Sequence, residues 1–259
     1  MLTDQATADQ LRAELARRDR ELAAVRAELE RHERAGAERE RQLERYAKDL
    51  RETFKQERVR SQELKRSYRA TVRALANAVE ARDAYTGRHA ERVAAYGLEI
   101  ALRAGIDIAH SPEIEFGFLL HDVGKVAVPD AILFKTGRLT GEEYALIAQH
   151  PVIGWEILRE IDFLGDAKLV VRHHHERWDG TGYPDRLASE DIPLSARVFA
   201  VADTLDALTT DRPYRPASDW AVARTEIRRV GGSQFDPFVV DAFEQVDDAT
   251  FAGIKDRIG

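Results

Sequence analysis

Histidine and aspartate side chains lie in apolar surroundings at several separate points of the sequence. His121 and Asp122 follow the apolar run GFLL, and Asp203 lies within ARVFAVADTLDAL. An ionised carboxylate among residues that favour burial is costly unless it is paired or binds a cation. These positions therefore suggest metal ligands, although Asp203 taken alone fits a helix acid paired with an arginine equally well.

Further histidines extend this candidate set. They are His89, His150 and the run from His173 to His175, and the chain contains no cysteine. Ligation by nitrogen and oxygen favours Fe, Mn, Zn or Mg over softer ions. Taken alone, His89 and His150 fit hydrogen-bonded core or surface histidines better than ligands. We expect His173 to point away from the others, because successive side chains on a helix lie about 100° apart.

Helices must bring these residues together, since beyond residue 70 nearly every segment has helical patterning. Ser111 is predicted to cap a helix that begins at Pro112. Thr140 and Glu143 have the spacing of a capping box, and Asp236 precedes another helix. No segment keeps an alternation of period two. The sequence therefore predicts an all-α domain.

The first 67 residues have the composition of a long helix, rich in Arg, Glu, Ala and Leu, with Gly36 as their only glycine. One seven-residue register contains Leu15, Leu22, Leu29, Leu43 and Leu50. Leu11, Val25 and Tyr46 occupy the intermediate position of the heptad. The pattern predicts a coiled coil that forms a parallel homodimer, with its weakest part near Gly36. A solvated single helix is the alternative.

Composition limits the classes of partner. The formal net charge is -7, and glutamates alternate with the arginines of the N-terminal segment. Nucleic-acid binding is therefore not expected. The sequence has no apolar run of about 18 residues and no basic start followed by an apolar stretch, so we expect a cytoplasmic protein without membrane insertion.

Five motifs, taken in order, resemble the signatures of HD-GYP domains, a branch of the HD phosphohydrolases. They are EARDAYTGRHAERV, LLHDVGK, QHPVIG, HHERWDGTGYP and ADTLDALTTDRPYR. The resemblance runs from about Ala70 to Phe243 and includes the closing GGSQFDP. It implies a helical-bundle HD-type metallohydrolase domain in residues 68–259, preceded by the coiled-coil helix of residues 1–67.

The resemblance also implies a site for two divalent metal ions, with iron or manganese favoured. One ion would be held by His89, His121, Asp122 and Asp203, and Asp122 would bridge to a second ion held by His150, His174 and His175. Some relatives hold a third ion on a glutamate four residues before the first histidine. Tyr85 stands at that position here, so we expect two ions.

Substrate contacts follow from the same resemblance. Lys125 would contact the scissile phosphate, beside His121 and Asp122 as catalytic residues. Guanine or phosphate contacts are expected from Asp83, Tyr183, Arg212 and Arg215. The fourth of these is often lysine in the family, so the geometry of its phosphate contact would differ.

The implied activity is hydrolysis of cyclic di-GMP to linear pGpG, with further cleavage to GMP left open. Two alternatives remain. The enzyme could act on another nucleotide, such as a cyclic GMP-AMP hybrid, although the GYP loop argues against a nucleoside polyphosphate. Otherwise the chain could bind cyclic di-GMP without turnover and signal through its coil. In either case an upstream sensor or signalling partner could act through the N-terminal helix.

Overall fold

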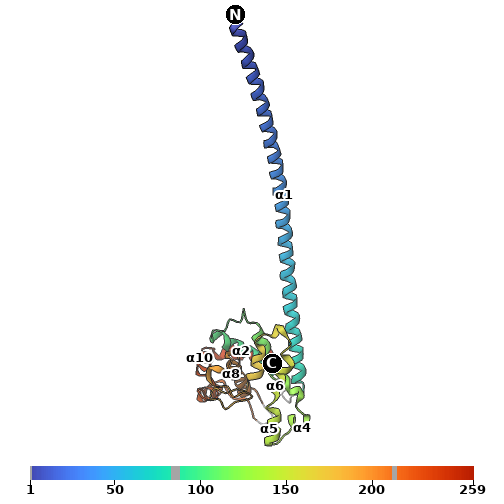
Figure 1. Cartoon of the computed structure of the whole chain (residues 1–259). Coiled ribbons are helices and arrows are strands. Elements are labelled where there is room, and N and C mark those ends of the chain that lie inside the picture. Colours follow the sequence, from blue (N-terminus) through green and yellow to red (C-terminus); the bar gives the residue numbers. More distant parts are fainter. Residues whose placement is uncertain (1, 83–87, 212–214) are drawn as a thin grey trace. The chain divides into compact units, whose positions relative to one another are not determined.

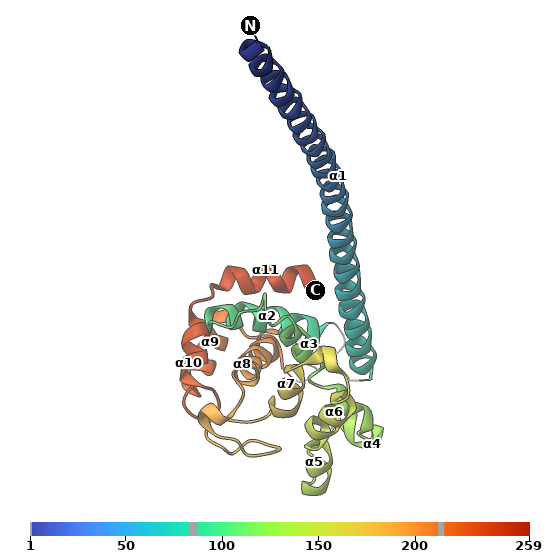
Figure 2. The ribbon, with the colours of Figure 1, turned by 45° about the horizontal axis from the view of Figure 1, so that its top comes forward.

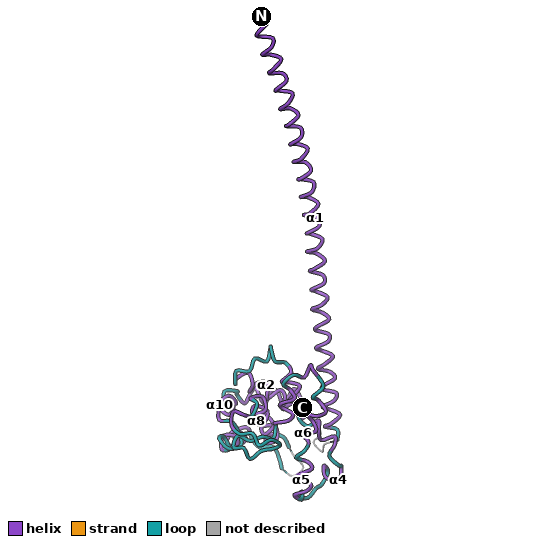
Figure 3. Tube along the Cα trace, viewed as in Figure 1, coloured by secondary structure: helices purple, strands orange, loops and turns teal. Residues whose placement is uncertain are grey.

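The computed structural model describes residues 2–82, 88–211 and 215–259, with side chains from residue 10 onward. Regular structure in these residues is helical, and no strand occurs among them (Figure 3). Gly231 and Phe235 form an isolated bridge. The predicted all-α fold is confirmed.

One very long helix begins the chain, and the helices that follow it are short. The α-helices are α1 (Leu2–Glu80), α2 (His89–Arg103), α3 (Glu113–Leu120), α4 (Asp130–Leu133), α5 (Gly141–Ile147), α6 (His150–Leu158), α7 (Ala167–His173), α8 (Leu194–Thr209), α9 (Trp220–Arg229), α10 (Pro237–Glu244) and α11 (Asp248–Ile258). Three 3₁₀ helices join them in the described residues: η1 (Val123–Ala127), η2 (Asp162–Leu164) and η3 (Ser189–Asp191). Within the described part of the chain, no helix combines the length and the apolar character needed to cross a bilayer.

The long N-terminal helix is confirmed, and it continues beyond the predicted boundary. The chain divides into two compact units, Met1–Arg66 and Ser67–Gly259, yet α1 runs unbroken through Gly36 and ends at Glu80. Val72 and Ala76 on its last turns are buried in the second unit. The assignment of residues 1–67 to dimerisation and of residues 68–259 to catalysis stays a prediction.

The predicted seam of α1 is exposed in the single chain. Its apolar side chains stand in solvent at Leu11, Leu15, Leu22, Val25, Leu29, Leu43, Tyr46 and Leu50. Ion pairs one turn apart, such as Arg18 with Glu14, support the helix from its charged faces. A helix of this kind gains little from its own apolar side chains unless a partner covers them.

The core of the second unit lies between α2 and α8 (Figure 1), and α3 and α7 pack beside them (Figure 2). Phe118 and Phe199 meet there with ring centroids 5.6 Å apart. A second aromatic group joins α11 to α2 through Tyr96 and Phe251, whose rings are 5.4 Å apart and nearly perpendicular. The core thus positions α2, α3, α7 and α8, which carry most of the predicted ligands.

Local signals for helix ends succeeded at two sites and failed at one. Thr140 and Glu143 form a complete capping box at the start of α5, and Asp236 accepts a hydrogen bond from the backbone N–H of Phe238. The predicted cap at Ser111 is wrong. Pro112 precedes the first helical residue of α3, and Ser111 lies one residue too early to cap it.

Gly124 allows η1 to approach α6 closely. A Cβ atom at this position would collide with the backbone carbonyl of His150 and with the amide of Gly154. Because η1 follows Asp122 directly, this packing brings the end of α3 against the start of α6. It also means that α3 does not continue to Lys125, which lies within η1 instead.

Candidate metal centre

Five α-helices position the predicted ligands. His89 begins α2, His121 and Asp122 follow α3, His150 begins α6, His174 and His175 follow the last turns of α7, and Asp203 lies within α8. We call these seven residues the cage: His89, His121, Asp122, His150, His174, His175 and Asp203. Most of them lie at helix ends, where a side chain can reach inward without displacing the apolar core.

One side of the cage gathers the first predicted ligand set. The Nε2 atom of His89 lies 3.3 Å from Oδ1 of Asp203. Nε2 of His121 lies 3.0 Å from Oδ2 of Asp122. One cavity is lined by all four of these residues, together with Lys125 and His175. The structure therefore brings the first predicted set to a single cavity.

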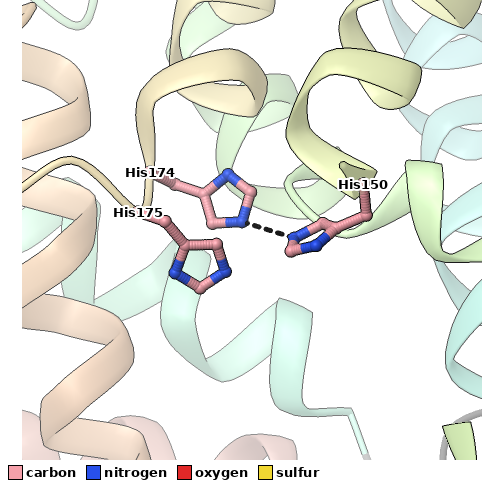
Figure 4. A group of neighbouring side chains, drawn as sticks. All are labelled: His150, His174 and His175. Atoms are coloured by element: carbon pink, nitrogen blue, oxygen red, sulfur yellow. Dashed lines mark hydrogen bonds between the residues drawn. The ribbon is translucent and has the colours of Figure 1, made fainter. Parts of the chain in front are cut away.

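The other side of the cage gathers three histidines. The ligating nitrogens of His150, His174 and His175 all lie within 4.8 Å of one another (Figure 4). Nε2 of His150 is 3.1 Å from Nε2 of His174. Oδ1 of Asp122 lies 3.3 Å from Nε2 of His150. Asp122 thus directs one oxygen toward His121 and the other toward His150, which is the geometry of a carboxylate between two cation positions.

Backbone carbonyls orient three of these imidazoles. The Nδ1 atoms of His121, His150 and His174 lie 2.7–2.9 Å from the carbonyl oxygens of Phe118, Ile147 and Val171 respectively. A carbonyl oxygen only accepts, so each Nδ1 must carry the proton and each Nε2 keeps its lone pair. This arrangement of a ligand nitrogen opposite a hydrogen-bonded one is typical of metal-binding histidines.

His89 is held differently, by a residue that sequence reasoning missed. Its Nδ1 atom lies 2.7 Å from Oδ2 of Asp206, which is buried. The Nε atom of Arg92 donates to the other oxygen of Asp206 at 2.7 Å. Arg92 lies three residues after His89, and Asp206 lies three after Asp203. That i,i+3 spacing on two helices was the available signal.

Ionisation in the cage divides its members into charged and neutral groups. Burial alone would raise the pKa of Asp122, but His121 and Lys125 outweigh it and hold that pKa well below its usual value. Burial likewise acts against ionised Asp203, and the hydrogen bond and charge of His89 lower its pKa to about 2. Burial lowers the pKa of His174, and lowers that of His175 to about 4. The cage therefore combines the anionic carboxylates of Asp122 and Asp203 with the neutral imidazoles of His174 and His175.

These donors fit divalent metal ions. Nε2 of His150 and Nε2 of His174 both present lone pairs and are 3.1 Å apart. Two lone pairs at that distance repel unless a cation lies between or beside them. Imidazole nitrogens and carboxylate oxygens suit Fe, Mn and Zn, and the cage offers both. The residues present thus meet the chemical requirement for a metal centre.

His173 faces away from the cage, in the direction that its helical position predicts. Its Nδ1 atom lies 3.6 Å from Oδ2 of Asp185 and 3.9 Å from Oε1 of Glu176. Arg172 forms a two-point ion pair with the same Asp185 at 2.7 and 2.8 Å. Asp185 directly follows the Gly-Tyr-Pro triplet in the sequence, so this group contacts the end of that loop.

The predicted substrate contacts are only partly gathered at the cage. Nζ of Lys125 lies 2.8 Å from Oδ2 of Asp122. The Tyr183 ring stacks on the His175 ring with centroids 4.7 Å apart and an interplanar angle of 26°. Arg215 is exposed and donates to the backbone carbonyl of Ala207, so its described contact lies outside the cage.

Three further predictions concern residues that the structure does not describe. Asp83 and Arg212, the other predicted guanine or phosphate contacts, lie outside the described residues. Tyr85, on which the expectation of two ions rather than three depends, lies there too. Their roles stay predictions.

Comparisons with known proteins agree with this arrangement of helices. A family model for the HD domain matches residues 73–239. The 3'3'-cGAMP-specific phosphodiesterase 2 of Vibrio cholerae is 42% identical over 182 residues, which cover 69% of this chain and 35% of the relative. The cyclic di-GMP phosphodiesterase response regulator RpfG of Xanthomonas campestris is 41% identical over 182 residues, or 70% of this chain and 48% of the relative.

A third relative, a cyclic di-GMP phosphodiesterase of Thermotoga maritima, is 41% identical over 170 residues, or 65% of this chain and 46% of the relative. The chain thus spans between about a third and a half of the length of the curated relatives it matches. Among solved structures, a cyclic GMP-AMP specific phosphodiesterase of V. cholerae superposes with a TM-score of 0.55 at 21% identity, covering 71% of this chain and 50% of the other. That likeness concerns the fold.

Proposed function

The chain belongs to the HD domain family, as its resemblance to HD-GYP proteins predicted, and we propose that it is a metal-dependent phosphodiesterase that hydrolyses cyclic di-GMP. One observation carries the proposal. The two oxygens of Asp122 point to different sets of histidines, 3.0 Å from His121 and 3.3 Å from His150. A carboxylate in that position suits a pair of cations, and paired cations suit phosphodiester cleavage.

The cage residues would hold two divalent ions in the sets predicted above, with iron or manganese favoured. Such ions would supply polarisation of the phosphate and activation of a water molecule. The chain's own residues would do the rest. Lys125, beside Asp122, would bring a positive charge to the phosphate oxygens, where negative charge grows during cleavage. Tyr183, stacked on His175, would form a wall for the substrate.

Cyclic di-GMP is the proposed substrate because two of the three relatives described above are named for it. A hybrid cyclic GMP-AMP is the second candidate, because another relative of similar identity is named for that substrate. A receptor that binds without turnover is less well supported. The complete set of seven donors in the cage would have no function in a protein that only recognises a base and a phosphate.

The other proposals concern assembly and location. We propose a homodimer through the exposed leucine series of α1, with an upstream sensor or signalling protein acting on the same helix. The cytoplasmic location stays a prediction.

Turnover measured together with metal content tests the proposed function. Purified without oxygen, the wild type should hold two metal ions per chain and convert cyclic di-GMP to pGpG. His121→Ala should lose at least one ion and reduce kcat by more than about 100-fold, which exceeds the usual cost of removing only a hydrogen-bond partner of a ligand. His110→Ala is the matched control, because His110 is exposed and pairs with Asp107 outside the cage.

Three outcomes distinguish the candidates. Faster cleavage of 3'3'-cGAMP than of cyclic di-GMP would replace the substrate and keep the reaction. Tight binding of cyclic di-GMP with no product from the metal-loaded wild type would favour the receptor. A protein that takes up no divalent ion under any loading condition would refute the enzyme altogether.

A further inference from the structure

Two short helices, α4 and α5, form an arm that contributes little to the core. Every residue of α4 and α5 is described, and none of them is buried. The arm holds itself together through Lys135 and Glu143, whose Nζ and Oε2 atoms are 2.6 Å apart, and through the capping box of Thr140. Arg82 ties its base to the end of α1 by an ion pair with Asp130.

This arm carries large apolar side chains in solvent. Tyr144 is 54% exposed and Phe134 is 49% exposed. A single exposed apolar residue needs no special explanation. The location of Tyr144 is what distinguishes it from Phe134.

Tyr144 is the outermost of three aromatic rings that lead away from the cage. The His175 ring stacks on Tyr183, and the edge contact between Tyr183 and Tyr144 follows, with centroids 6.2 Å apart and an interplanar angle of 76°. His175 is a predicted metal ligand, and Tyr183 belongs to the Gly-Tyr-Pro triplet. The arm therefore places its exposed aromatic ring next to the proposed substrate wall.

The same ring lines a cavity that reaches the cage. Its wall includes Tyr144, Tyr183, His175 and Asp203. Gln234 also lines it and offers both a donor and an acceptor. An aromatic face, a polar amide and the reacting centre thus share one cavity.

We propose that Tyr144 is a substrate-contacting residue whose ring stacks on one guanine base of the cyclic dinucleotide. The inference rests on the proposed function and adds a base-binding position on the arm. Aromatic rings bind bases through their faces, and a half-exposed ring has a face available. The edge contact with Tyr183 orients that ring before the substrate arrives.

The test compares Tyr144→Leu and Tyr144→Phe with the wild type, on cyclic di-GMP and on bis(p-nitrophenyl) phosphate. Leucine removes the aromatic face, so KM for cyclic di-GMP should rise about tenfold while kcat changes little. Phenylalanine keeps the face and should stay within about twofold of the wild type. In Tyr144→Leu, cleavage of bis(p-nitrophenyl) phosphate should fall less than cleavage of cyclic di-GMP, because a nitrophenyl ring offers a smaller stacking face than a guanine base. Phe134→Leu is the matched control, because Phe134 is exposed on the same arm but is not among the described residues that line the cavity.

Several results would overturn the proposal. An unchanged KM in Tyr144→Leu would remove the stacking role and leave the enzymatic function intact. An equal rise of KM in Tyr144→Phe would show that the hydroxyl group, and not the aromatic face, contacts the substrate. Reduced metal content in Tyr144→Leu would make the residue structural.

A failure of the proposed substrate can be separated from a failure of Tyr144. If the wild type cleaves bis(p-nitrophenyl) phosphate but not cyclic di-GMP, the substrate assignment fails. Calorimetric titration with GMP then tests whether the Tyr144 ring stacks on a base. Weaker GMP binding in Tyr144→Leu than in Tyr144→Phe supports this role. Equal GMP affinity in both variants would refute it.

Discussion

The Nδ1 atom of His89 lies 2.7 Å from Oδ2 of Asp206, although 117 residues separate them in the chain. Asp206 is buried, and Arg92 donates to both of its oxygens at 2.7 and 3.1 Å. A carboxylate behind a ligating histidine fixes the ring and raises its basicity. We therefore expect Asp206 to position His89 in the cage.

We expect Asp206→Asn to weaken metal binding by about 10- to 100-fold, the usual cost of losing such a partner. Titration of metal-free protein with Mn²⁺ measures the affinity, and excess Mn²⁺ should restore much of the turnover. Asp107→Asn is the control, because Asp107 contacts the exposed His110 at 2.6 Å in a similar His-Asp pair outside the cage. Equal affinity in Asp206→Asn and the wild type would show that Asp206 does not position a ligand.

The protonation of His89 makes metal uptake depend on pH. Burial lowers the pKa of His89, but hydrogen bonds and charges from Asp203 and Asp206 outweigh burial and raise it from 6.5 to about 10. In the metal-free protein the protonated ring therefore stabilises the fold. This contribution is fully present below pH 6.5 and is lost as the pH rises through about 10.

A metal ion on Nε2 must displace that proton, so affinity should rise with pH. His174 and His175 have lowered pKa values and are neutral at pH 7, so they release no protons when a metal ion binds. We expect release of about one proton per chain from His89 at pH 7, and about a tenfold gain in affinity per pH unit between pH 6 and 8. Calorimetry in two buffers of different ionisation enthalpy counts the protons. No release would mean that His89 does not bind the metal through Nε2.

Local patterns predicted much of the fold because their causes are local. The heptad leucines and the capping box of Thr140 depend on neighbours within a few residues, and the helices they predict are present. The cap predicted at Ser111 failed because two adjacent residues compete for one helix start, and the chain begins its helix after Pro112. Lys125 lies in the 3₁₀ helix η1, where Gly124 closely approaches α6.

The cage was inferred from a family resemblance and not from spacing. Its members come from five α-helices, and nothing in the helical periodicity of one segment specifies which distant segment it meets. Asp206 and Arg92 were missed because their contact spans 114 residues. Tyr144 was missed for a different reason. An aromatic residue at helical spacing indicates a core position, and only the structure shows that α5 leaves it exposed.

Glu176 holds the loop that carries Tyr183. Its Oε1 atom accepts a hydrogen bond from the backbone N–H of Asp185 at 2.7 Å, and its Oε2 atom is buried without a hydrogen-bond partner among the described residues. The Glu176 side chain itself is buried. One side chain therefore anchors the segment after the Gly-Tyr-Pro triplet.

Glu176→Ala should lower the free energy of unfolding by about 1–3 kcal/mol, because the part-buried backbone N–H of Asp185 loses its charged acceptor. It should also raise KM for cyclic di-GMP, since Tyr183 loses its fixed place on His175. Glu176→Gln keeps a carbonyl acceptor and should recover most of both losses. Chemical denaturation and steady-state kinetics measure the two effects, with Glu190→Ala on exposed η3 as the control. A stability loss without any change in KM would limit Glu176 to a structural role.

The exposed leucines of α1 predict a dimer, and charged residues introduced at these positions should dissociate it. Leu22 and Leu29 lie one heptad apart and are 53% and 58% exposed in the single chain. Burying a leucine side chain is worth about 1.5–3 kcal/mol, and a parallel pair buries each position twice. The double variant Leu22→Glu and Leu29→Glu should therefore weaken self-association by at least about 100-fold, because it also sets like charges opposite each other.

Sedimentation of the full chain measures the mass, and Arg20→Glu is the control because position 20 lies opposite the seam in the same register. A wild type that sediments as a monomer would refute the coiled coil and leave a solvated helix. If the double variant is monomeric with unchanged kcat, the helix serves assembly only. A monomer with altered kcat would instead support a regulatory role for α1, because Ala76, Val79 and Glu80 near its end line the cavity of the proposed metal centre.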